Sequence, residues 1–127
     1  MPARFRFPRD LRLRKRREFL LVQGRGRRIS GRHFQFFVLR RAESASPGMA
    51  AAARFGITVT RKVGNAVVRN RIKRIVREGC RRVPELFPAG LDVVVMARSS
   101  AATARLSDVA GELSELVRRL GSGGGLR

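Results

Sequence analysis

A change of hydrophobic period between residues 54 and 83 restricts the fold more than any other feature of the sequence. The stretch RFGITVT, residues 54–60, reads as a strand, with Phe55, Ile57 and Val59 facing one way. From residue 66 to residue 83 the apolar side chains recur at helical spacing, within an arc of about 140°. The members of this arc are Ile72, Ile75, Val76, Gly79, Cys80 and Val83. A strand followed by a long amphipathic helix predicts helices packed on a sheet, the α+β class.

The boundaries of this helix and the remaining elements follow from local signals. Asn65 can cap the helix, and Pro84 and Pro88 stop it. RKRREFLLVQG predicts a short helix ending at Gly24, with Phe19 and Val22 on one face. A strand is expected at residues 33–40, where both faces are apolar and should be covered by other elements. Another is expected at residues 91–97, a nearly continuous apolar run that suits an interior strand. A last helix should be capped by Ser107 and end at Gly121, and residues 25–31 leave room for one more strand.

Length and punctuation indicate one domain. The chain has 127 residues, and nothing in it marks a second core. Residues 1–12, which contain two prolines, read as a basic flexible arm, residues 13–120 as the folded domain, and residues 121–127 as a Gly-rich flexible tail. We therefore expect a sandwich of helices on a small sheet.

Positive charge is concentrated in two segments. Lys and Arg number 29 against 9 Asp and Glu, a formal charge of +20, and residues 1–33 and 54–83 hold 22 of these 29 cations. Such concentrated positive charge repels itself in a compact fold, and its simplest explanation is a polyanionic ligand that neutralises it. Nucleic acid is the first candidate and an anionic membrane the second. Because 26 of the 29 are Arg, most can grip phosphate through a bidentate fork, although a biased genome composition would give the same excess.

The basic helix carries the strongest functional signal. Its polar arc is nearly all positive, whereas a solvated helix surface usually mixes both signs. Asn70 stands among these cations, and its amide can donate and accept at a base edge or a 2′-OH. This arc holds Lys73, Arg77, Asn70, Arg81 and Arg74, and Glu78 offsets only part of its charge. The pattern favours nucleic-acid binding over a plain solvated surface.

Other chemistry finds little support in the residues. His33 lacks a cluster with metal-ligand spacing, Cys80 lies on the apolar helix face, and the carboxylates are scattered, so no catalytic or metal-ligating residue is expected. No phosphate-binding glycine loop is recognisable. No stretch approaches about 18 apolar residues, and the N-terminus lacks a signal peptide. We expect a cytoplasmic protein that does not enter a membrane.

The run TRKVGNAVVRNRIKRIVRE closely resembles the signature of the bacterial ribonuclease P protein subunit, which includes Arg69-Asn70-Arg71 followed by Lys73-Arg74. The resemblance extends over about residues 11 to 120, with the other elements in the family's order. It implies a single-domain α-β-β-β-α-β-α sandwich, like domain 2 of ribosomal protein S5, with an unusual left-handed β-α-β crossover.

The resemblance also implies function. In that family a large RNA carries the catalytic groups and cleaves precursor tRNA with bound Mg²⁺, while the protein binds this RNA subunit and the single-stranded 5′ leader; no protein partner is expected. The residues matching the RNA contact are Arg61, Lys62, Arg69, Asn70, Arg71, Lys73, Arg74 and Arg77, and those matching the leader cleft are Phe19, Phe37, Arg69 and Asn70. Both phenylalanines also fit an ordinary core. Gln23 stands where the family often has another aromatic, which puts one stacking contact in doubt.

Two other functions fit parts of the sequence. A small basic ribosomal or ribosome-assembly protein would share the size, charge and α+β make-up, but is not expected to carry the whole signature. A protein-only, Mg²⁺-dependent nuclease would need clustered carboxylates, which the sequence does not offer. The identity of the RNA that co-purifies with the chain distinguishes a ribosomal protein from a ribonuclease P subunit. Cleavage of precursor tRNA by RNA-free protein would establish the protein-only nuclease.

Overall fold

The computed structural model describes residues 13, 15–40, 53–82 and 90–122, and the side chains of residues 82, 121 and 122 are outside this description. The order of its main elements is α-β-β-β-α-β-α, as the resemblance implies, and two short 3₁₀ helices, η4 and η6, follow β3 and β4. The bounds are α1 Arg16–Arg25, β1 Arg27–Ser30, β2 Phe34–Arg40, β3 Arg54–Thr58, η4 Arg61–Val63, α2 Ala66–Arg82, β4 Leu91–Ala97, η6 Ser99–Thr103 and α3 Leu106–Ser122. The strand for which residues 25–31 left room is β1.

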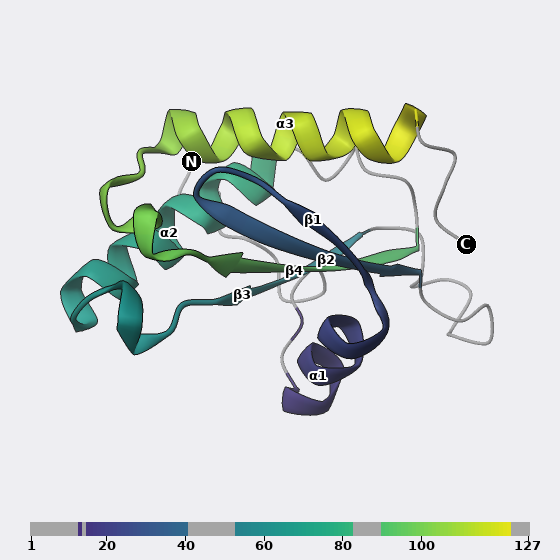
Figure 1. Ribbon diagram of the computed structural model, residues 1–127, viewed down its shortest axis with the longest axis horizontal. Coiled ribbons are helices and arrows are strands. Elements are labelled where there is room, and N and C mark those ends of the chain that lie inside the picture. Colours follow the sequence, from purple (N-terminus) through teal and green to yellow (C-terminus); the bar gives the residue numbers. More distant parts are fainter. Residues whose placement is uncertain (1–12, 14, 41–52, 83–89, 123–127) are drawn as a thin grey trace, which may run out of the picture.

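The sheet has four strands in the order β1-β2-β4-β3. β2 is antiparallel to both β1 and β4, whereas β3 and β4 are parallel and are connected through α2. This parallel pair requires a crossover connection, and its left hand stays a prediction. Figure 1 shows the result as three layers, with α2 and α3 on one face of the sheet and α1 on the other.

Each face of the sheet carries a buried core, as the apolar character of both faces of β2 predicted. Phe34, Phe36 and Val38 belong to the main core beneath α2 and α3. The alternate residue Phe37 packs with Val94 of β4 and with residues of α1 in a second, smaller core. The strand alternation therefore sorts side chains between two cores of unequal size.

The basic helix is placed as its sequence predicts. The Asn65 side chain accepts a hydrogen bond from the Val68 backbone N–H at 3.0 Å, so the predicted cap is confirmed. Ile72, Val76 and Cys80 are fully buried. Burial also raises the pKa of the Cys80 thiol, which fits the structural role expected for this residue.

Several predicted boundaries were wrong by one or two residues. The first helix runs past Gly24 to Arg25, and Gly26 caps it. The strand expected from residue 33 begins at Phe34, and the one expected to reach residue 60 ends at Thr58. The last helix begins at Leu106, where the Arg105 N–H donates to Asp108 Oδ2 at 2.8 Å, so Ser107 is not its cap. The helix continues to Ser122, into the predicted tail. Residues 1–12, Pro84 and Pro88 lie outside the described residues.

A partly buried group of ion pairs ties α1 to the sheet. Arg54 of β3 donates through Nε and Nη2 to the two oxygens of Asp92 on β4, at 2.9 and 2.8 Å. Its Nη1 also lies 3.5 Å from Glu18 Oε2 of α1. The Asp92 hydrogen bond, followed by the attraction of both carboxylates, raises the pKa of Arg54 against the effect of burial. This cation is committed to the fold.

The turn between β1 and β2 is held by a side chain from α3. The backbone N–H of His33 donates to both oxygens of Glu112, at 2.9 and 3.1 Å, and the N–H of Phe34 donates to Oε1 at 3.1 Å. A carboxylate is a strong acceptor for such converging donors. Residues far apart in sequence thus fix the edge of the sheet.

Candidate nucleic-acid interface

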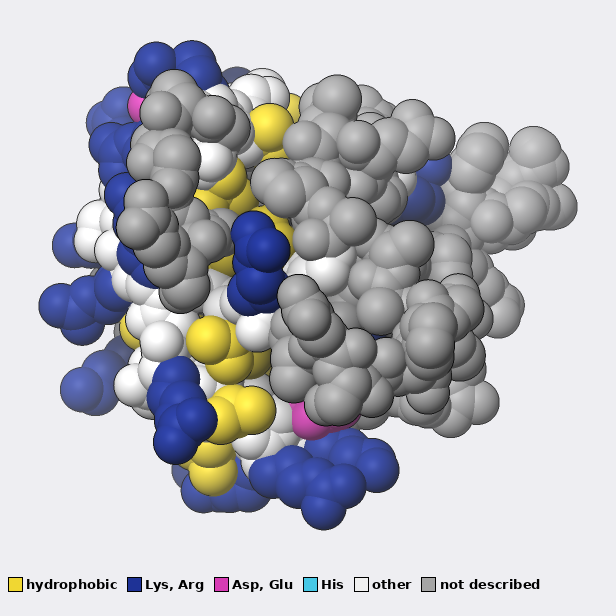
Figure 2. Space-filling model, turned by 90° about the vertical axis from the view of Figure 1, so that its right-hand side faces the viewer, with side chains coloured by type: hydrophobic (Ala, Val, Ile, Leu, Met, Phe, Trp, Pro, Cys, Tyr) yellow, Lys and Arg dark blue, Asp and Glu magenta, His cyan; other side chains and the backbone are white. Residues whose placement is uncertain are grey.

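The predicted RNA-contact residues lie on η4 and along α2, and we call the set the α2 basic surface. Its members, given above, differ in exposure. Arg61, Lys62, Asn70, Arg74 and Arg77 are exposed, and Arg69, Arg71 and Lys73 are half-buried. Figure 2 views the molecule from the right-hand side of Figure 1, and Lys and Arg side chains project along the margins of that view, where Asp and Glu are visible only in small patches.

Carboxylate partners separate the structural arginines from those available to a ligand. Arg54, Arg81, Arg118 and Arg119 each pair with an aspartate or glutamate. Within the described part of the chain, no ion pair involves the cations of the α2 basic surface. Because none of the described carboxylates pairs with these cations, their charge is not neutralised there, and an unneutralised basic surface favours phosphate as a ligand.

Two members of the surface are oriented by backbone carbonyls. Arg71 donates from Nη2 to the Ala102 oxygen of η6 at 2.9 Å, and Arg69 donates from Nε to the Gly64 oxygen at 3.2 Å. Each bond uses one donor of a guanidinium that has five. These side chains therefore have fixed directions and spare donors. Ala102 has no recognisable signal in the sequence, because it lies 31 residues from Arg71.

A groove on the α1 face of the sheet follows from strand register. Gln35 of β2 lies opposite Met96 of β4, and Met96 lies beside Thr58 of β3. All three side chains are half-buried, whereas Phe37 and Val94 in the next row are buried under α1. The row Gln35–Met96–Thr58 therefore forms a partly open floor, with polar ends and an apolar centre, which sequence reasoning missed.

The wall of this groove is one side of α1. On one side of α1, Glu18 forms an ion pair with Arg54 of β3, and on its inner side Val22 packs into the small core. Phe19 and Gln23 lie about 100° and 140° around the helix from Glu18, so they face the side of the open row. Both are half-buried, and the Phe19 ring lies against Gly56, where an added Cβ would approach it within 2.6 Å. We call this wall and floor the α1 groove.

The predicted leader-cleft residues fall on three elements, α1, β2 and α2. Phe19 and Phe37 meet in the small core, where Phe37 is only 8% exposed, so its main contacts are those of a core residue. Arg69 and Asn70 are neighbours on α2, at the end of the chain segment that leaves β3 through η4. Their joint action in one cleft stays a prediction.

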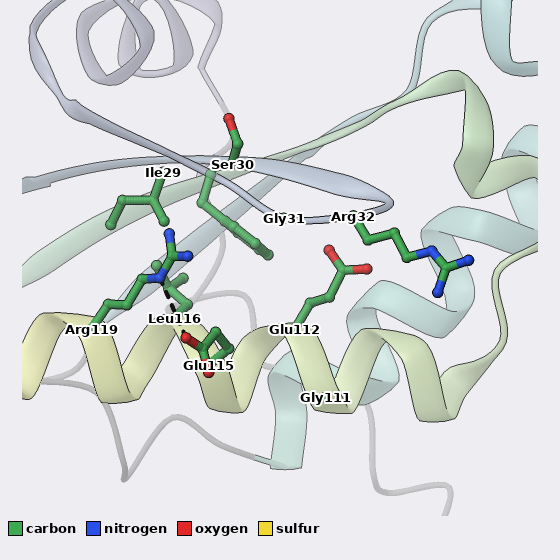
Figure 3. A pocket seen from close by; sticks show the side chains of 10 residues that line it. Ile29, Ser30, Gly31, Arg32, Gly111, Glu112, Glu115, Leu116 and Arg119 are labelled. Carbon is green, nitrogen blue, oxygen red and sulfur yellow. Dashed lines mark hydrogen bonds and ion pairs between the residues drawn. The ribbon is translucent and has the colours of Figure 1, made fainter.

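The described residues also form a pocket away from both surfaces. Its volume is about 320 Å³, and it lies between the β1–β2 turn and α3. Figure 3 shows Glu112 of α3 pointing toward the turn at Gly31 and Arg32, and Arg119 lying below Ile29 at the other end of the pocket, with a bond between Glu115 and Arg119. Its two carboxylates already accept hydrogen bonds from the backbone or from arginines. Mixed, internally paired charge of this kind favours a structural role.

Sites for metals or membranes have no support in the described residues. In the described ranges no three His, Cys, Asp or Glu side chains gather to hold a metal ion. No helix there is both long and apolar enough to cross a membrane. The His33 Nδ1 lies 3.2 Å from Ser100 Oγ, and that hydroxyl donates to the Arg32 carbonyl, a local link that closes the turn.

Comparison with known proteins gives this arrangement its context. Residues 7–121 match the family described as Ribonuclease P. The chain belongs to the ribonuclease P protein family. It is 47% identical over 119 residues to the ribonuclease P protein component of Desulfovibrio desulfuricans, covering 92% of this chain and 88% of that one. It is 38% identical to the corresponding protein of Syntrophus aciditrophicus, covering 85% of each.

Solved ribonuclease P proteins share the fold. The protein from Thermotoga maritima aligns with a TM-score of 0.71 at 33% identity, covering 85% of this chain and 96% of that one. A mutant of the Staphylococcus aureus protein with defective mRNA degradation activity aligns with a TM-score of 0.74 at 27% identity, covering 87% and 88%. The α+β fold inferred from the sequence is therefore confirmed.

Proposed function

We propose that this chain acts in the bacterial cytoplasm as the protein subunit of ribonuclease P. In this function it binds the catalytic RNA subunit through the α2 basic surface and holds the 5′ leader of precursor tRNA. It thereby assists the Mg²⁺-dependent endonucleolytic cut that produces the mature tRNA 5′ end. The catalytic groups reside in the RNA subunit, and the protein contributes binding and positioning.

One observation carries the proposal: the family's basic motif forms a largely exposed surface whose cations pair with none of the described carboxylates, and a groove suited to a single strand lies beside it. Cations that neutralise several phosphates release counterions, which is the main source of affinity for RNA. The Phe19 ring and the floor of the α1 groove offer apolar surface on which a base can stack, worth about 1–3 kcal/mol per base. The two surfaces are connected by the short segment from Thr58 to Arg61.

The donor set on the protein explains why we assign Mg²⁺ to the RNA. Mg²⁺ prefers carboxylate oxygens and water in a near-octahedral shell. Asp92 is committed to Arg54, Glu78 to Arg81 and Glu115 to Arg118. The described side chains therefore do not fit a dedicated Mg²⁺ site, and the protein acts on Mg²⁺ demand only indirectly, by neutralising phosphate charge.

Reconstitution with the matched RNA subunit tests the proposal. The holoenzyme should cleave precursor tRNA at lower Mg²⁺ than the RNA alone, and an unchanged Mg²⁺ midpoint at physiological salt would contradict the proposed assistance. Cleavage by RNA-free protein would instead establish a protein-only nuclease. Co-purified RNA gives an independent result, because a ribosomal protein would retain ribosomal RNA and a ribonuclease P subunit one RNA of a different sequence.

A further inference from the structure

The side of α1 that faces away from the sheet exposes apolar side chains that the fold does not use. Among the described residues three large hydrophobic side chains are exposed, and two of them, Leu20 and Leu21, are neighbours on this helix, 53% and 50% exposed. They lie about 160° and 100° around α1 from Val22, which packs into the small core, so both point away from the sheet. Figure 1 shows α1 on the opposite face of the sheet from α2, which separates these leucines from the α2 basic surface.

Gly24 leaves an open notch beside the two leucines. At about 100° per residue, Gly24 falls between Leu20 and Leu21 around the helix, one turn further along. An added Cβ at Gly24 would meet nothing within 4 Å, so no packing contact requires glycine at this position. Glycine disfavours a helix more than any residue except proline. The position therefore lowers the stability of α1 and leaves room above the helix for a side chain from another molecule.

Three arginines surround this apolar strip. Around the helix, Arg16 and Arg25 lie at its two margins, and Arg17 lies within it. All three are exposed, and within the described part of the chain no ion pair involves them. We call these arginines, together with Leu20, Leu21 and Gly24, the outer α1 surface. A ligand that suits it must offer both apolar side chains and negative charge.

Other occupants match only part of this chemistry. A nucleic acid would contact the arginines through phosphate, but its bases stack on aromatic rings, and the aromatic side chain of α1, Phe19, packs toward the small core. A second copy of the chain would bring arginines against arginines. An anionic membrane binds helices that present a broad apolar face, whereas the outer α1 surface offers two leucines.

We propose that the outer α1 surface docks an acidic amphipathic helix of another protein. An apolar side chain of that helix lies over Gly24, between Leu20 and Leu21, and carboxylates on both flanks of its apolar stripe pair with the three arginines. Because the surface lies across the sheet from α2, the chain can hold this partner while RNA occupies the α2 basic surface. The proposal goes beyond the proposed function and can be tested on the chain alone.

Fluorescence anisotropy with a labelled synthetic peptide tests the docking. The probe is a helical peptide with leucines three and four residues apart and glutamates on both flanks, and the control peptide has glutamine in place of every leucine. At about 0.15 M salt, the full chain should bind the probe about tenfold more tightly than the control peptide. Leu20→Ala with Leu21→Ala should remove most of this difference and keep the helix, because alanine is the best helix former. Val67→Ala, which changes the exposed apolar residue of α2, should bind like wild type.

Two further variants separate docking from stability and from net charge. Gly24→Gln should raise the midpoint of urea unfolding, since glutamine favours a helix more than glycine does, and yet weaken probe binding several-fold, because its side chain fills the notch. Arg17→Ala should weaken probe binding about threefold, whereas Arg105→Ala should leave it unchanged. Arg105 is the matched control, because it is equally exposed and pairs with no described carboxylate, but it lies outside the outer α1 surface.

Several outcomes would overturn the proposal. Equal affinity for the probe and the control peptide, or equal losses for Arg17→Ala and Arg105→Ala, would show that charge alone holds the peptide. Release of the probe on addition of the RNA subunit would place the peptide on the α2 basic surface. A Gly24→Gln variant that gains stability without losing probe affinity would remove the notch from the site. Vesicles of phosphatidylglycerol and an oligouridine are the remaining probes, and binding to either that depends on Leu20 and Leu21 in the absence of peptide binding would assign the surface to lipid or to RNA.

Discussion

Replacing Arg74 with alanine should weaken binding to the RNA subunit by the amount of one phosphate contact. Arg74 is exposed on α2 and has no carboxylate partner among the described residues. One lost contact to duplex RNA lowers the log-log salt slope by about 0.9, by analogy with B-DNA. At 0.15 M salt that slope corresponds to about a fivefold loss of affinity, or about 1 kcal/mol.

Arg81→Ala is the matched control, because it removes the same charge from the same helix. Arg81 is already paired with Glu78, and its side chain is 21% exposed. We expect its salt slope to stay within about 0.3 of wild type, since a neutralised cation releases few counterions on binding.

The assay is filter binding of the labelled RNA subunit across salt concentrations from 0.05 to about 0.5 M, the range in which counterion release dominates. Circular dichroism first confirms that both variants fold like wild type. Equal slopes for the two variants would refute the reasoning, because net charge alone would then govern affinity. An unchanged slope for Arg74→Ala would remove this residue from the RNA interface.

Three further predictions concern the substrate, the fold and the charge. Asn70→Ala should lower the affinity of the holoenzyme for precursor tRNA more than its affinity for mature tRNA. An equal loss of affinity for both would assign Asn70 to the contact with the RNA subunit or to a structural role. Arg54→Met should lower the free energy of unfolding, measured by urea denaturation, by about 2–4 kcal/mol, because the buried Asp92 loses its ion pair with Arg54. The double variant Arg54→Met with Asp92→Leu should recover most of this loss. Sulfate should raise the melting temperature more than chloride does at matched ionic strength. An anion that binds the folded state should add up to about 2.7 kcal/mol to the free energy of unfolding at a hundredfold excess over its dissociation constant. Equal effects of the two anions would mean that general screening of charge is sufficient.

Elements with strong local signals were predictable from the sequence. The period of α2 and its Asn65 cap placed that helix, and the apolar run of β4 matched Leu91–Ala97 at both ends. Local errors arose where signals compete. Ser107 is a good cap by type, but Asp108, three residues after Arg105, accepts a hydrogen bond from the Arg105 N–H, and the helix begins two residues earlier than a Ser107 cap would give.

Features built from distant residues were not predictable. The row Gln35–Met96–Thr58 depends on the register of two strand pairs, and no local pattern encodes the register of strands that long segments separate in the sequence. The bond from Arg71 to the Ala102 oxygen likewise joins elements that only the tertiary fold brings together. The motif therefore identified the α2 basic surface, whereas the groove required the structure.

The hydrogen bonds between Glu112 and the β1–β2 turn have a consequence for biosynthesis. Glu112 lies 78 and 79 residues after the two backbone groups that it binds, so the ribosome must make almost the whole chain before the turn is secured. Contacts of such long range form late in folding, because closing the long intervening loop costs conformational entropy before the contact itself can stabilise the fold. We expect a nascent chain that lacks α3 to leave β1 frayed, so that RNA meets a finished groove only after translation of the last helix.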